Sequence, residues 1–409
     1  MIVAEMRAAS PALPATRHPQ EPALSPLAPD AILTEGARRA GAPAPGDAAW
    51  VDALDRLLHS ARDEGGLHEA GAAAFAEKCT GLVAERLRGE TLLAAHPEIT
   101  ERPLPVRFAV AGLARSGTTF LHRLLACDPA VEFLPTWQAF APVPPVAGPD
   151  TRRAAMVERV EAIRAADPGA LARHPLDADA PEEEVFLLQH SFASMLFGLA
   201  CPLPSYMAWL NTTDHTAAYR FAFDLLRANE WHAGIPTGRP RVMKSPQLVL
   251  DLAAVAALLP DTVIAQNHRD PVDLVGSYCS TYASSRRGSC TTMDPIALGR
   301  ERLGQLEAMA GRSLAARTAA EQAGAGDRFV DVHYDRLITD PLGVVEQLYA
   351  TAGLTVPTAA RAAMERWIAD HPQHAAGTHD YDLADYGLDR ATVEAALADY
   401  ERRFAPGGH

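Results

Sequence analysis

Residues 111–120 of this sequence form a glycine-containing stretch, AGLARSGTTF. A short, mostly apolar run with β-branched valines precedes it at 106–110, and apolar residues recur at helical spacing through 118–126. This order predicts a strand, a loop and a helix. In such a loop, glycines let backbone N–H groups surround a phosphate at the helix N-terminus. The alternative is an ordinary strand-to-helix turn capped by Ser116.

Thr118 stands where the phosphate loop of a nucleoside triphosphatase carries its lysine. Threonine cannot reach the outer phosphates of a triphosphate, and the only cation inside the loop is Arg115. The loop therefore favours a ligand with a single phosphate at this point. A P-loop kinase or hydrolase with an altered loop is the alternative, but no acidic Mg²⁺ site is evident after a strand.

Composition bounds the class of protein. The chain of 409 residues can form one large α/β domain with a helical extension, or two domains. A formal net charge of −14 disfavours a nucleic-acid-binding protein. The five cysteines lack paired spacing, which favours reduced thiols and a cytoplasmic location over a disulfide framework or a zinc site. The longest apolar stretch, 252–259, is too short for a membrane span, and no signal peptide is evident.

Strand and helix patterns alternate along most of the chain. Short apolar runs predict strands at 241–244, 262–268 and 329–333, and helices are expected at 152–166, 247–259, 271–283, 342–352 and 359–369. This alternation predicts an α/β fold: a P-loop-like parallel sheet flanked by helices, whose ligands lie at the carboxyl ends of the strands. Two further helices are expected within 182–232, separated by Pro202 and Pro204.

The expected division of the chain has three parts. An Ala- and Pro-rich arm without periodicity, at residues 1–30, reads as disordered. A helical extension follows at 31–100, with apolar side chains at helical spacing. Residues 101–409 then form the α/β domain with its helical insertions.

Two of the predicted strands end in a cation. Lys244 ends the first, and Arg269 follows the second, with Ser277 eight residues further along a predicted helix. An arginine and a serine placed in this way fit a second phosphate. The alternative is that Arg269 forms an ion pair with Asp270 or Asp273 and that Ser277 is a tolerated polar residue.

Taken together, these features resemble the sulfotransferases that use 3′-phosphoadenosine 5′-phosphosulfate (PAPS), and most closely a bacterial branch of that family. The similar stretches are 115–119, 242–246, 268–271, 332–334 and 386–388, over a region from about Phe108 to Phe404. The resemblance implies that the loop holds the 5′-phosphosulfate and that Arg269 and Ser277 hold the 3′-phosphate. The donor-binding residues it implies are Arg115, Ser116, Gly117, Thr118, Thr119, Arg269, Ser277 and Tyr334.

Sulfuryl transfer builds negative charge on the oxygen between phosphorus and sulfur, and a cation there lowers the barrier. Lys244 and Arg115 are the candidates for that cation. The acceptor must also lose a proton to a base. Relatives often carry a histidine where this chain has Leu248 and a glutamate where it has Gln138, and neither replacement can accept a proton.

Among the remaining groups, Glu183 within the trio 182–184 and His190 are the candidates for the base. The alternatives are an acidic helix N-terminus for the trio and simple packing for the histidine. Because the usual proton acceptors are missing, a repurposed or non-catalytic relative that keeps the nucleotide cleft is a further hypothesis.

Two more regions bear on the ligands. Relatives tend to have basic residues beside the glycine and histidine of 377–381, where this chain has Thr378 and Asp380. The spacing of His371, His374 and His379 fits no common metal site, and this chemistry needs no metal.

The aromatic residues between 186 and 232 can line a pocket for a small, partly apolar acceptor. We expect a small-molecule acceptor as partner, with a homo-oligomer as a possibility.

Overall fold

The computed structural model describes residues 26–166, 176–371 and 382–404. Its centre is a parallel sheet with the strand order β2-β1-β3-β4. The strands span Val106–Gly112 (β1), Arg241–Lys244 (β2), Val263–His268 (β3) and Phe329–His333 (β4). Each neighbouring pair is parallel, so the carboxyl ends of all four strands meet at one edge of the sheet.

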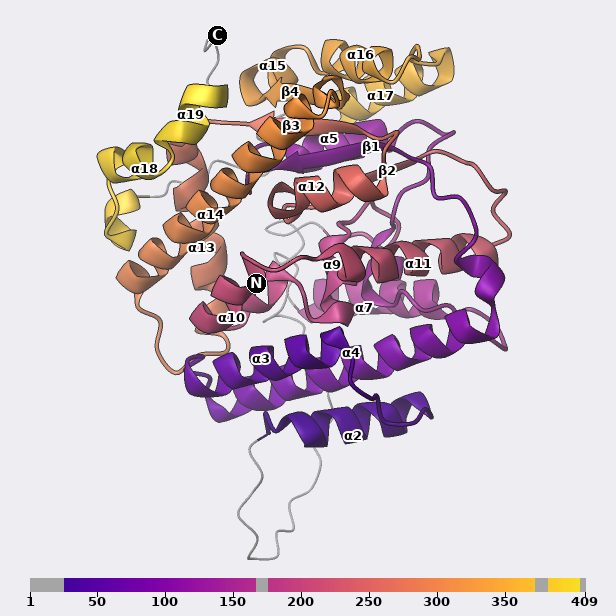
Figure 1. Ribbon diagram of the computed structural model, residues 1–409, viewed down its shortest axis with the longest axis vertical. Coiled ribbons are helices and arrows are strands. Elements are labelled where there is room, and N and C mark those ends of the chain that lie inside the picture. The colour runs from indigo at the N-terminus through magenta and orange to yellow at the C-terminus, as the bar shows by residue number, and fades with distance from the viewer. Residues whose placement is uncertain (1–25, 167–175, 372–381, 405–409) are drawn as a thin grey trace, which may run out of the picture.

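Helices cover both faces of this sheet. Along β1, Phe108 and Val110 pack into one core with apolar residues of β3 and β4, whereas Ala109 and Ala111 pack into the larger core on the other face. A strand buried on both faces is typical of a parallel sheet. In Figure 1, α15 (Tyr334–Thr339), α16 (Pro341–Thr351) and α17 (Thr358–Asp370) lie on one side of the sheet, and α12 (Leu248–Leu258) lies on the other.

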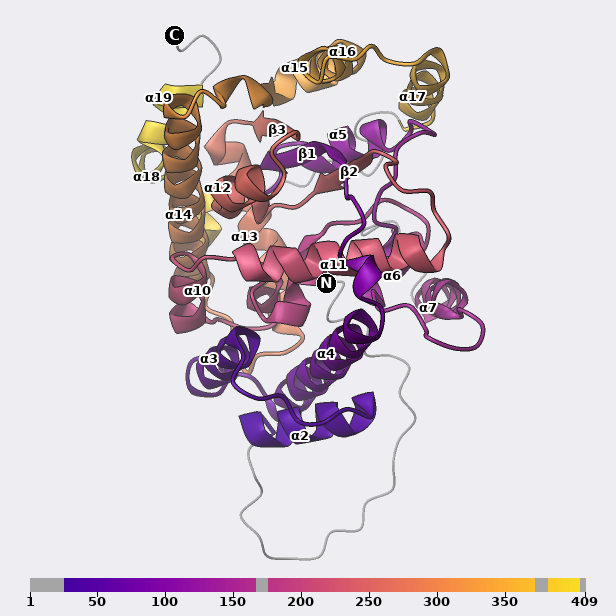
Figure 2. The same cartoon turned by 45° about the vertical axis from the view of Figure 1, so that its right-hand side comes forward.

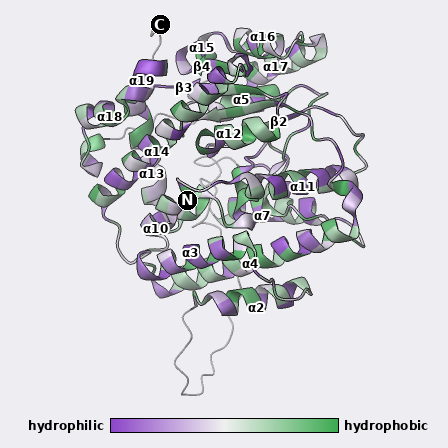
Figure 3. Cartoon of the chain, viewed as in Figure 1, coloured by the Kyte–Doolittle hydropathy of each residue, from purple (hydrophilic) through white to green (hydrophobic). Residues whose placement is uncertain are grey.

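The remaining helices extend the larger core. Figure 3 shows that α12 is mostly hydrophobic, as suits a helix between the sheet and α14 (Pro295–Gln322). The others in this core are α6 (Thr136–Phe140), α9 (Val185–Leu188), α10 (Pro204–Leu210), α11 (Thr216–His232), α13 (Pro271–Arg287), α18 (Arg390–Ala396) and α19 (Ala398–Phe404). Helix α7 (Arg152–Ala166) packs against α6, and α5 (Thr118–Leu125) packs into the smaller core on the side of α17.

The N-terminal part of the described chain is a helical layer formed by α2 (Pro29–Ala40), α3 (Ala49–Asp63) and α4 (Glu69–Ala95). Figures 1 and 2 place this layer at the opposite end of the molecule from α15–α17. Gly36 allows α2 to approach α4 closely, because a Cβ on that residue would lie 2.4 Å from Cγ1 of Val83. The arm expected at residues 1–30 lies largely outside the described residues.

The predicted fold class is confirmed, and the predicted strands at 241–244 and 329–333 match β2 and β4 residue for residue. The prediction for 182–232 is wrong in its first half. There the chain forms the four-residue α9 and two 3₁₀ turns, Gln189–Ser191 and Met195–Leu199, instead of a continuous helix. Phe192 between those turns has a φ of 51°, which a helix cannot accommodate. The 28-residue α14 has no counterpart among the expected helices.

None of the described helices combines the length and the apolar character that crossing a bilayer requires.

Candidate active site

The loop after β1 has the backbone of a tight turn into a helix. Arg115 and Gly117 have φ values of 72° and 87°, and the Ser116 hydroxyl donates a hydrogen bond of 2.7 Å to the carbonyl oxygen of Leu113. A side chain at Gly117 would meet the ring of Tyr334 at 3.0 Å, so only glycine fits. The loop therefore delivers the chain to the first residue of α5 with its backbone N–H groups directed toward the carboxyl edge of the sheet.

Arg115 is the exposed cation of this loop. Its guanidinium makes no hydrogen bond or ion pair with any residue that the structure describes. A non-glycine residue in the left-handed region is uncommon and stores backbone strain, which clusters at ligand-binding loops. The free guanidinium beside a helix N-terminus is suited to an anion.

Lys244 connects the loop to the acidic segment, residues 182–184. Its side chain is 3% exposed, and its ammonium donates a hydrogen bond of 3.1 Å to the Thr119 hydroxyl and forms an ion pair with Glu183. Lys244 is the last residue of β2, and both its backbone N–H and its backbone carbonyl are hydrogen-bonded to Glu184. Its N–H donates to the carboxyl group of Glu184 at 2.7 Å, and its carbonyl accepts from the Glu184 N–H at 3.2 Å.

The acids of this segment differ in their surroundings. Burial raises the pKa of Glu184 to about 8, so this residue is largely protonated at neutral pH. Burial, and then the charge of Glu183, raise the pKa of Glu182 to about 7. A carboxyl group with a pKa near the working pH can accept and release a proton. The site therefore combines a buried cation with neighbouring groups that can take part in proton transfer.

Arg269 lies directly after β3, beside the loop. Its Nη1 is 3.5 Å from the Arg115 carbonyl oxygen, and its guanidinium lies 4.3 Å from the centre of the Tyr334 ring. Its other side pairs with Asp273 at 3.1 Å, which is one of the two pairings weighed from the sequence. Ser277 is buried two helical turns along α13.

A cavity of about 510 Å³ opens at the carboxyl ends of β3 and β4. Its walls include His268, Arg269, Pro271, Tyr334 and Phe404. Cavities of this size hold ligands as large as a nucleoside. The structure thus brings Arg115, Lys244, Arg269 and Tyr334 to the same edge of the sheet.

His190 lies elsewhere. It is buried in the turn after α9, its Nδ1 is 3.2 Å from the carbonyl oxygen of Leu187, and burial lowers its pKa to about 4. The charges that it senses are those of Arg86 and Lys78 on α4, not those of the loop or Lys244. It stays a sequence prediction that this geometry does not support.

Sequence reasoning missed His122 on α5. It lies one turn beyond Thr118, is 1% exposed, and its Nε2 has no hydrogen-bond partner among the described residues. Burial and the charge of Lys244 hold its pKa well below the ordinary value, so the ring is neutral. The four-residue spacing from Thr118 was the available signal, because residues at i and i+4 share a helix face.

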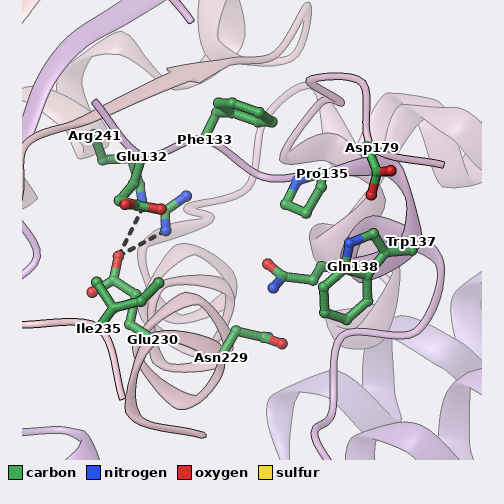
Figure 4. Close-up of a pocket in the computed structure, with 10 residues that line it drawn as sticks. All are labelled: Glu132, Phe133, Pro135, Trp137, Gln138, Asp179, Asn229, Glu230, Ile235 and Arg241. Atoms are coloured by element: carbon green, nitrogen blue, oxygen red, sulfur yellow. Dashed lines mark hydrogen bonds and ion pairs between the residues drawn. The ribbon is translucent and has the colours of Figure 1, made fainter. Parts of the chain in front are cut away.

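Neither of the two positions that lack proton acceptors lines the cavity at the ends of β3 and β4. Leu248 is fully buried at the start of α12, within the larger core. Gln138 on α6 lines a second cavity of about 260 Å³, together with Trp137 and Arg241 (Figure 4). Residues 377–381 and the histidines at 374 and 379 lie outside the described residues. Within the described part, no three His, Cys, Asp or Glu side chains gather as metal ligands.

The model of the sulfotransferase family matches residues 107–358. The crystal structure of the sulfotransferase STF1 from Mycobacterium tuberculosis H37Rv aligns with 90% of this chain and 98% of its own, with 29% identity and a TM-score of 0.78. That of the sulfotransferase STF9 from Mycobacterium avium aligns with 95% and 98%, with 24% identity and a TM-score of 0.82, and shows the shared fold.

No curated protein sequence matches the chain significantly. The family model nevertheless covers more than half of the chain and includes the loop, Lys244, Arg269 and Tyr334. The chain belongs to the sulfotransferase family.

Proposed function

We propose that this protein transfers a sulfuryl group from PAPS to a hydroxyl or amine of a small molecule and releases adenosine 3′,5′-bisphosphate. One observation carries the choice of donor. The loop has Arg115 and a helix N-terminus for one phosphate, a threonine in place of the lysine that a triphosphate requires, and a separate cation, Arg269, after the next strand of the sheet. PAPS carries single phosphates at separate positions of its ribose, which fits two separated anion sites.

The residues present fit such a donor. The backbone N–H groups at the start of α5 and the unpaired guanidinium of Arg115 would hold the 5′-phosphosulfate. Arg269 and Ser277 would hold the 3′-phosphate, and the cavity beside Tyr334 has room for the base.

Lys244 is our candidate for the cation that stabilises the transition state. Its ammonium is buried and fixed by Thr119 and Glu183, so it needs no reorganisation when charge develops on the oxygen between phosphorus and sulfur. Glu183 holds the ammonium in place and is our candidate for the group that takes the acceptor's proton. The acidic segment thus offers proton acceptors although Gln138 and Leu248 cannot act as such, which favours an enzyme over a non-catalytic relative.

The free thiols of all five cysteines support the proposed cytoplasmic location.

A turnover experiment tests the proposal. The protein is incubated with PAPS and a panel of small hydroxylated and aminated compounds, and release of adenosine 3′,5′-bisphosphate is followed. At least one compound should stimulate release, and Lys244→Ala should reduce the rate by about 10²–10³-fold, the usual effect of removing one stabilising group. Arg328→Ala is a matched control, because that cation binds carbonyl oxygens at 259 and 260, near the amino end of β3. Equal rates for Lys244→Ala and the native chain would contradict the role of Lys244.

A further inference from the structure

The cavity of about 260 Å³ shown in Figure 4 is separate from the donor loop. Successive side chains of a strand point to opposite faces of its sheet, so Arg241 and Lys244, three positions apart, face opposite sides of β2. The contacts of the two side chains are consistent with this, because Arg241 pairs with Glu230 of α11 and Lys244 with Thr119 of α5. The cavity therefore lies at the outer edge of the sheet, on the face that α11 covers.

Most of the polar groups around this cavity already have partners. The side-chain amide of Asn229 donates to the carbonyl oxygens of Pro142 and Leu225 at 2.7 and 2.8 Å and accepts from Arg152 at 2.9 Å. The three carboxylates are each paired with an arginine: Glu230 with Arg241, Glu132 with Arg239 and Asp179 with Arg153. The charge around the cavity is thus balanced.

Two groups remain available. Arg241 is 2% exposed, and both of its bonds to Glu230 come from Nε and Nη2, so the buried Nη1 has no partner among the described residues. In Figure 4 the side of the guanidinium away from Glu230 faces the interior of the cavity. The amide of Gln138 points inward from α6 and makes no hydrogen bond with any described residue. A buried N–H without a partner is unfavourable, and a bound hydrogen-bond acceptor removes this cost.

The rest of the wall is apolar. Phe133, Pro135, Trp137 and Ile235 surround the two available groups. A cavity of about 150 Å³ is enough for benzene, so 260 Å³ takes a six-membered ring with a short polar substituent. An added carboxylate would be an unbalanced charge here, because every arginine on this wall already has an acidic partner.

We propose that this cavity is a binding site for a small uncharged molecule with an apolar ring and a carbonyl oxygen, which accepts hydrogen bonds from Arg241 Nη1 and the Gln138 amide. The ring packs between Trp137 and Ile235. The site is apart from the donor cavity and does not depend on which donor the protein uses.

Benzamide is a suitable probe, with benzoate as the charged analogue of the same shape. Ligand-observed NMR on the full chain should give saturable benzamide binding in the low-millimolar range and at least tenfold weaker binding of benzoate. Saturating adenosine 3′,5′-bisphosphate should not displace benzamide.

Two variants test the assignment. Gln138→Leu should weaken benzamide binding by about threefold to tenfold, as expected for one lost hydrogen bond. Gln322→Leu makes the same substitution at an exposed residue on the last turn of α14 and should change nothing. Arg241→Lys keeps a positive charge beside Glu230 but removes Nη1, and should weaken benzamide without improving benzoate.

The proposal would be overturned by no saturable binding of benzamide, by equal binding of benzoate, or by an unchanged affinity in Gln138→Leu. Displacement by the bisphosphate would also overturn it, because it would place benzamide in the donor cavity. Failure of the bisphosphate to bind at all would count against the proposed donor alone.

Discussion

Asp273→Asn should tighten the binding of adenosine 3′,5′-bisphosphate. The Asp273 carboxylate lies 3.3 Å from Nε and 3.1 Å from Nη2 of Arg269. These are two of the nitrogens that a phosphate would use for a bidentate contact. A bound 3′-phosphate must therefore displace Asp273 or share the guanidinium with it.

The size of the effect follows from exposure. The two side chains are 29% and 51% exposed, and an ion pair this exposed contributes about 0.5–1 kcal/mol at most. Removing this competition should lower the dissociation constant by about twofold to fivefold. The gain should shrink in high salt, because salt screens exposed charges.

Calorimetric titration of the native chain and the variant in low and high salt measures this change. Asp335→Asn is the matched control, since Asp335 lines the same cavity but has no contact with Arg269 among the described interactions. If Asp273→Asn binds the bisphosphate no more tightly than Asp335→Asn does, competition for Arg269 is refuted and only the net charge matters.

Three further substitutions have defined outcomes. Gly117→Ala forces a side chain into a backbone with a φ of 87° and against Tyr334, so bisphosphate affinity in calorimetry should fall at least tenfold; unchanged affinity would contradict the loop assignment. Glu184 has a pKa raised from 4.5 to about 8, so the folded state keeps a proton that the unfolded state releases, and the free energy of unfolding should fall as pH rises through this range. Glu184→Gln should remove that decline, by at most about 5 kcal/mol in denaturant titrations, and an equal slope in both proteins would refute the buried neutral acid. His190 has a pKa lowered from 6.5 to about 4, so stability should fall as pH drops through that interval. His190→Gln should flatten the loss without changing PAPS turnover, and a collapse of turnover in the folded variant would restore His190 as a candidate base.

The strands were predictable because each is a short, mostly apolar run, and two of them could be seen to place a cation, Lys244 or Arg269, at a common edge. The helix α14 was not, because buried arginines interrupt its apolar pattern. Arg302 and Arg317 are 0% and 4% exposed and pair with Glu301 and Asp331. Such pairs place charged side chains in the core, whereas charged positions in a sequence pattern normally predict an exposed face.

The candidate site likewise contains residues that could be placed from the sequence and contacts that could not. The loop, Lys244 and Arg269 could be placed from the sequence because each lies at the carboxyl end of a predicted strand. The contact between Lys244 and Glu183 joins residues 61 positions apart and could not. The first predicted helix after residue 182 failed because the Glu184 carboxyl binds the Lys244 backbone, which fixes the chain across the end of β2 instead of letting it continue as a helix.

Two separate sites for single phosphates make the affinities of the native chain for adenosine 3′,5′-bisphosphate, AMP and Mg²⁺-ATP, measured in one calorimetric series, the decisive quantities. We expect the bisphosphate to bind at least tenfold more tightly than AMP, Arg269→Ala to remove this difference, and Mg²⁺-ATP to bind no better than AMP. Equal affinities for the bisphosphate and AMP, or a preference for Mg²⁺-ATP, would show that the site does not hold two separate single phosphates.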